Sequence, residues 1–78
     1  MARTKVGVLI GIYNMNYLYL DVEYRSYREL ISKVEEECAN RYRKFLIIGI
    51  FLEDGNYLQK PRDKWYLFDT VQNTAIEI

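Results

Sequence analysis

The sequence predicts an α/β protein with a three-stranded parallel sheet in the order 3-2-1 and flanking helices, which is half of a doubly wound fold. Residues 6–12 and 45–52 are apolar without polar alternation, as is typical of strands covered on both faces. A pattern with helical period separates these two runs. The predicted order of strand, helix, helix, strand, helix and strand then requires right-handed crossovers between parallel strands.

The first predicted strand is Val6 to Ile12. The residues that follow, 14–20, are predicted to continue as one or two helical turns, with Asn14 or Asn16 as the N-cap. Residues 21–25 are predicted to form an extended connector. The first crossover would thus consist of this short helix, the connector and a second, longer helix.

The longer helix is predicted to begin at Ser26, because Ser26 and Glu29 form the S-x-x-E pattern in which both side chains satisfy backbone donors of the first turn. Its apolar residues recur at three- and four-residue spacings, which places them on one face. They are Tyr27, Leu30, Ile31, Val34 and Cys38.

The second predicted strand is Phe45 to Leu52, and the turn residues 53–56 end it. Pro61 suits the first turn of a helix, which is predicted to run to about Asn73. A short third strand is predicted at residues 75–78. These elements form one domain, because 78 residues are too few for two cores.

Composition excludes several classes of function. Eleven basic and eleven acidic residues cancel, so no overall field draws the chain to nucleic acid or to an anionic membrane. No apolar run approaches the ~20 residues that span a bilayer, and no secretory signal is recognisable, so we expect a cytoplasmic protein without a membrane partner. With Cys38 as the only cysteine and no histidine, what remains is carboxylate-bound Mg²⁺ or Mn²⁺ chemistry, or no chemistry at all.

Four segments, "VGVLIGIYNMN", "YRELI", "FLIIGIF" and "WYLFDTVQNTAIEI", follow one another along nearly the whole chain. Their order and spacing resemble the first half of NYN domains, the LabA-like branch of the PIN-like ribonucleases. The resemblance implies that residues 1–78 form a single truncated NYN-like domain with a PIN/Rossmann-like sheet. It also implies a site at the carboxyl edge of that sheet, where open α/β folds bind ligands.

In that family the first strand ends on an aspartate, and an asparagine follows three residues later. Asn14 matches the asparagine, but Gly11 stands in place of the aspartate, and the family's later acids have no counterpart here. Cleavage of a phosphodiester requires several carboxylates around Mg²⁺, so the resemblance implies an incomplete domain with no catalytic residues. Mg²⁺ or Mn²⁺ would enter only with residual ribonuclease activity. Alternatively, Gly11 simply allows close packing or a positive φ.

Two adjacent acids, Glu53 and Asp54, are the candidates for a cation site, because they follow the second strand at the same edge. Two acids before Gly55 are also ordinary turn chemistry, which is the alternative interpretation.

The candidate nucleic-acid site is a basic cluster interleaved with an aromatic side chain, a combination that holds phosphates and stacks bases. Its residues, with the asparagine at the same edge, are Asn14, Lys60, Arg62, Lys64 and Trp65. The alternatives are a solvated helix start with Trp65 in the core, and Asn14 as a helix cap.

A half-domain of this kind would leave its first strand as an apolar edge with unpaired backbone groups, so we expect a homodimer. Its interface residues would be Val6, Val8, Ile10, Ile12 and Met15. The leading interpretation is a homo-oligomerising interaction module or a fragment of a longer nuclease-like protein. The alternatives are an RNA-binding protein that uses the carboxyl edge, and a ribonuclease completed by another chain.

Overall fold

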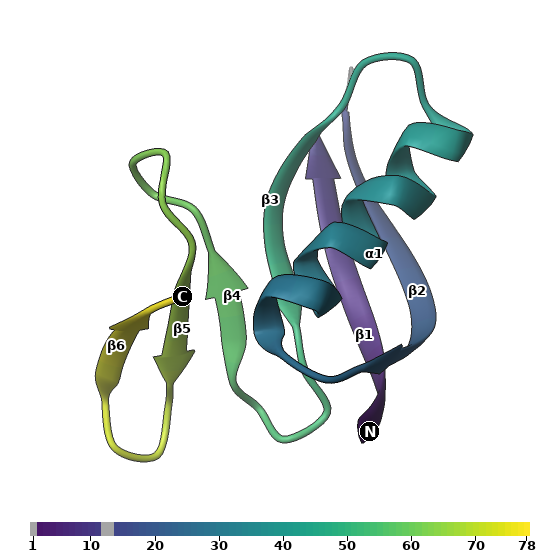
Figure 1. The fold of residues 1–78 in the computed structure, drawn as a ribbon. Helices are drawn as coiled ribbons and strands as arrows, with labels where there is room; N and C mark the ends of the chain where they lie inside the picture. The colour runs from purple at the N-terminus through teal and green to yellow at the C-terminus, as the bar shows by residue number, and fades with distance from the viewer. Residues whose placement is uncertain (1, 12–13) are drawn as a thin grey trace.

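The computed structural model describes residues 2–11 and 14–78. It contains a six-stranded antiparallel sheet and, within the described residues, a single helix (Figure 1). The elements are β1 (Ala2–Gly11), β2 (Met15–Tyr24), α1 (Tyr27–Arg41), β3 (Leu46–Phe51), β4 (Tyr57–Gln59), β5 (Tyr66–Asp69) and β6 (Thr74–Glu77), and the sheet order is β2-β1-β3-β4-β5-β6. The predicted three-stranded parallel α/β sheet, and with it the Rossmann-like fold implied by the resemblance, is therefore wrong.

Strand β2 replaces the predicted helical turns and connector. It pairs antiparallel with β1 along its whole length, from Gly11 opposite Met15 to Ala2 opposite Tyr24. The reason is visible in the sequence NYLYLDVEY, in which apolar aliphatic residues alternate with aromatic and acidic residues at the two-residue period of a strand. That period prevailed over the capping preference of the two nearby asparagines.

Helix α1 confirms the prediction made for residues 26 onward. Ser26 is its N-cap, with the hydroxyl oxygen accepting from the Glu29 amide at 3.2 Å, and the Glu29 carboxylate accepts in turn from the Arg25 amide at 3.2 Å. The helix buries Leu30, Ile31, Val34 and Cys38, which belong to the predicted apolar face. It covers one face of the sheet at β1, β2 and β3, while β4 to β6 extend to its side (Figure 1).

The C-terminal part is a meander of β4, β5 and β6, so the helix predicted from Pro61 to about Asn73 is wrong. Asp63 has a φ of 67° and Asn73 a φ of 56°, and both left-handed residues interrupt helical geometry. The Asp69 carboxylate accepts from the amides of Val71 and Gln72 and closes the turn between β5 and β6. Residues 65, 67, 68 and 71 have the spacing of one helix face, but Tyr66–Asp69 form strand β5.

The core lies between α1 and the sheet. Its side chains come from one face of α1 and mostly from alternate strand positions that face the helix. The buried hydrophobic residues are Val6, Val8, Ile10, Val22, Leu30, Ile31, Val34, Cys38, Ile50, Leu52, Leu58 and Leu67. None of the described helical segments is long and apolar enough to cross a membrane.

Candidate interaction surface on the helix-free face of the sheet

Six aromatic rings stand on the face of the sheet opposite α1, and we call this set the aromatic row. Strand pairing places them there, because Tyr17 and Tyr19 lie opposite Leu9 and Gly7 of β1, whereas the neighbouring Val8 and Ile10 point into the core. The row continues across β3, β4 and β5 through the same alternation. Its members are Tyr19, Tyr17, Phe51, Tyr57, Phe68 and Tyr66.

Each ring of the aromatic row contacts the next. Tyr57 and Phe68 are the most nearly parallel pair, with ring centroids 5.0 Å apart and planes 9° from parallel. Tyr17 and Phe51 stack at 6.1 Å and 19°. Nearly parallel rings at these separations overlap in an offset stack, so the neighbouring ring covers part of each ring face.

Two glycines make room for these rings. A Cβ atom on Gly7 would lie 2.3 Å from Cε1 of Tyr17, and one on Gly49 would lie 3.3 Å from Cε2 of Phe51. The ring of Tyr17 therefore crosses above β1, where any larger residue would collide with it, and reaches Phe51 on β3. The rings cover backbone that α1 leaves uncovered on this side.

The aromatic row is most exposed at the β2 end of the sheet. Tyr19 exposes 79% of its surface and Tyr17 exposes 47%, whereas the other four members are half-buried. Leu9, also half-buried, adds an aliphatic contact on the same face. This face therefore exposes aromatic rings and an aliphatic side chain, most of all on β2.

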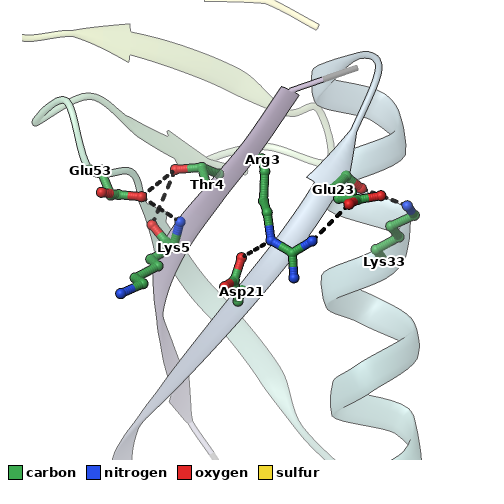
Figure 2. Close-up of polar contacts among 7 residues, drawn as sticks. All are labelled: Arg3, Thr4, Lys5, Asp21, Glu23, Lys33 and Glu53. Carbon is green, nitrogen blue, oxygen red and sulfur yellow. Dashed lines mark hydrogen bonds and ion pairs between the residues drawn. The ribbon is translucent and has the colours of Figure 1, made fainter.

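Strand register places a charged cluster on the same face as the row, toward the N-terminal end of β1, where Arg3 lies opposite Glu23. Figure 2 shows the contacts of this cluster. Nε of Arg3 lies 2.9 Å from Oδ1 of Asp21, and its Nη1 lies 2.7 Å from Oε1 of Glu23. The hydrogen bond from Arg3 to Asp21, with the charges of both acids, raises the pKa of the guanidinium. Lys33 of α1 donates to the carbonyl oxygen of Glu23.

Glu53 and Asp54, the predicted cation candidates, are engaged in local structure. Oε1 of Glu53 accepts from the Lys5 amide at 2.7 Å and lies 3.5 Å from the Thr4 hydroxyl (Figure 2). Oδ1 of Asp54 accepts from the Asn56 amide at 2.9 Å, which is turn chemistry. Among the described residues, no group of three or more acidic, histidine or cysteine side chains could hold a metal ion.

Gly11 has neither of the structural roles considered for a glycine at that position. It is absent from the described residues with positive φ, and a Cβ there would make an ordinary contact with Ile48 at 3.4 Å. An alanine would fit at this end of β1.

The predicted nucleic-acid residues are brought together only in part. Lys60, Lys64 and Trp65 line one groove between α1 and the meander, together with acidic residues that include Glu35. Lys64 pairs with Glu77 at 3.7 Å, and Trp65 is half-buried against the core, although no helix begins here as the alternative interpretation had it.

The two other members of that predicted site lie apart from this groove. Arg62 is exposed in the β4–β5 connection, and Asn14 precedes β2, where its carbonyl accepts from the Asn16 side chain. The groove is therefore not lined by them.

The predicted dimer edge is occupied within the chain. Val6, Val8 and Ile10 are core residues, and β1 pairs with β2 on one side and with β3 on the other. Met15 is exposed on β2, and Ile12 lies outside the described residues. The free strand edge on which this prediction depended therefore does not exist at β1.

Comparisons with protein-family models, curated proteins and solved structures gave no match to this chain. The aromatic row, which sequence reasoning missed, is consequently the main functional lead. Its signal was present in the two-residue period of the tyrosines at 17 and 19 and of the aromatics at 66 and 68.

Proposed function

We propose that this chain is an interaction module that forms a homodimer through the helix-free face of its sheet. The aromatic row is the observation that carries the proposal, because soluble proteins rarely leave a contiguous apolar surface of this kind without a partner. Two copies would pack face to face as a sandwich, with the rings of one row against those of the other.

The size and charge of the face are compatible with a second copy. An aromatic side chain contributes roughly 150–250 Å², so the exposed parts of Tyr17 and Tyr19 supply about 250 Å² per protomer. The half-buried rings and Leu9 add to this, for a total near the lower end of specific interfaces, about 1,000 Å². In the neighbouring charged cluster, Arg3 pairs with Asp21 and Glu23 and so offsets part of their negative charge on this face.

A stack of nucleic-acid bases fits this face less well. Bases stack on free ring faces beside cations that hold phosphates, whereas the rings of the row stack on one another. Two cations follow the row on this face of β1: Lys5 lies opposite Asp21, and Arg3 is held by Asp21 and Glu23. The geometry therefore supports a protein partner over RNA.

Sedimentation velocity at about 100 µM and after roughly hundredfold dilution tests the proposal, because a weak dimer dissociates by mass action. We expect the mass of two chains at the high concentration. Tyr19→Lys places a charge in the interface and should give a monomer at both concentrations, with an unchanged circular dichroism spectrum.

The matched control is Val71→Lys, which makes a similar change at an apolar residue that is 87% exposed in the β5–β6 turn. This variant should dimerise like the parent chain. A monomeric parent chain at the high concentration, or equal loss of dimer in both variants, would overturn the proposal. Salt-sensitive binding of single-stranded RNA that Tyr19→Lys abolishes would instead assign the face to nucleic acid.

A further inference from the structure

The outer edge of β2 is the longest strand edge that remains unpaired among the described residues. Lys33 donates to the Glu23 carbonyl, so that carbonyl points away from β1. Because backbone groups of alternate residues point to the same side of a strand, the amides and carbonyls of Tyr17, Tyr19 and Asp21 also point outward. This edge presents a row of hydrogen-bonding groups to an additional strand.

Carboxylates flank one half of that edge on both sides. Glu36 and Glu37 project from α1, and Asp21 and Glu23 belong to β2; together with Val22 and Lys33 these residues line a groove between the helix and the strand. Three of the four acids have cationic neighbours, because Arg3 contacts both β2 acids and Arg41 lies 3.6 Å from Glu37. The side chains of these pairs are about half exposed, and exposed ion pairs contribute little stability. Each carboxylate can therefore also contact a cation of an incoming ligand at little cost.

We propose that the β2 edge binds an extended, lysine- or arginine-bearing segment of a partner protein, which adds a seventh strand to the sheet. Main-chain hydrogen bonds along residues 17–21 would supply affinity, and the flanking carboxylates would select basic side chains. The other half of the segment would lie beside Tyr17 and Tyr19, which favours apolar side chains there. The proposal does not depend on the homodimer, which uses the sheet face.

A second copy of this chain fits the edge poorly. Pairing two β2 edges about a two-fold axis would bring one acidic groove next to another, and like charges at a shared interface oppose association. A basic segment has the opposite charge and meets no such repulsion.

A synthetic octapeptide of four Lys or Arg residues followed by Val-Thr-Val-Thr, with blocked ends, tests the proposal. We expect saturable binding in calorimetry and increased hydrogen-exchange protection at the amides of Tyr17, Tyr19 and Asp21. The same peptide methylated on alternate backbone nitrogens should bind at least about tenfold more weakly, because it cannot complete the strand ladder.

On the protein side, Glu36→Lys should weaken binding by about tenfold, since it reverses a charge in the groove. Glu35→Lys makes the same change at a helix residue that lines the groove on the other side of α1, and it should bind like the parent chain. No binding of the unmodified peptide, equal binding of the methylated peptide, or equal effects of both variants would overturn the proposal.

Discussion

The ring of Tyr17 lies over Gly7, so close that a Cβ atom on that glycine would fall 2.3 Å from Cε1 of the ring. Gly7→Ala should therefore displace the ring from its stack with Phe51. Because the colliding atoms belong to the outer end of a side chain that is 47% exposed and can swing aside, we expect a loss of at most about 1 kcal/mol in the free energy of unfolding, less than the usual cost of overpacking a core. Urea denaturation of the variant measures it.

A double-mutant cycle isolates this contact. In a chain that already carries Tyr17→Ala, the change Gly7→Ala should be neutral or stabilising by up to about 1 kcal/mol, because alanine restricts the unfolded chain more than glycine does. Equal losses in both backgrounds would show that the cost arises from the backbone at Gly7 and not from the ring.

The carboxylate of Glu53 takes the place of a strand carbonyl beyond the end of β3, where it accepts from the Lys5 amide. Glu53→Ala should lower the free energy of unfolding by about 1 kcal/mol, the usual net value of such a hydrogen bond. Glu53→Gln, which keeps an acceptor oxygen, should lose less. If the two variants are equally destabilised in urea, the acceptor is not what stabilises this corner.

Stability should fall at alkaline pH. Burial raises the pKa of the Cys38 thiol, despite the opposing attraction of Arg41, and burial also raises the pKa of Tyr27. A raised pKa means that the native state holds its proton longer than the unfolded chain, so the stabilisation is complete below the ordinary thiol pKa of about 8.5 and is lost as the pH rises through the native value.

Cys38→Ala removes the thiol and, with it, the thiol's contribution to the pH dependence of stability. The slope of unfolding free energy against pH, measured from about pH 8 to 10, should be shallower in this variant than in the parent chain. The comparison uses slopes because the smaller side chain also lowers stability at every pH. Parallel curves would contradict the assignment.

RNA cleavage is not expected, because the carboxylates needed to hold a divalent metal do not gather in the described residues. Labelled single-stranded RNA incubated with the chain and Mn²⁺ should stay intact. Cleavage that copurifies with the chain and disappears in Asp54→Ala would refute this prediction.

If the predicted basic residues bind RNA, the affinity should lie near the nonspecific range of roughly 10⁻⁴ to 10⁻⁶ M and fall with salt. Changing Lys60, Arg62 and Lys64 to alanine together should abolish it. Fluorescence anisotropy with a labelled oligonucleotide measures both effects, and an undiminished affinity in the triple variant would refute the site.

The sequence predicted the secondary structure correctly where a segment carries only one pattern. The Ser26–Glu29 cap and the helical spacing of Leu30, Val34 and Cys38 had no competing pattern, and α1 forms there. The apolar run at β3 also forms a strand, but its two apolar faces were attributed to helices on both sides. In the structure α1 covers one face, and rings from neighbouring strands cover much of the other.

Prediction failed where short segments carry two patterns at once. Residues 65–71 match a helical spacing, but residues 65–68 are also a short run of four apolar or aromatic residues, which suits a strand equally well. Left-handed backbone at Asp63 and Asn73 lies on either side of this segment. The candidate surface was missed for a related reason, since it depends on the register of five strands, β2, β1, β3, β4 and β5. Register follows from which strands pair, which local periods do not determine.

Strand order also divides the chain into two parts, in each of which every strand pairs with a strand that is its neighbour in sequence. Strand β2 follows β1 directly, and β3 to β6 pair one after the next, so only the β1–β3 pairing joins segments that are distant in sequence. Closing that long loop is costly in chain entropy before any contact repays it. We therefore expect β1–β3 docking to limit the folding rate, with φ-values for Val8→Ala and Ile50→Val above that for Leu67→Ala.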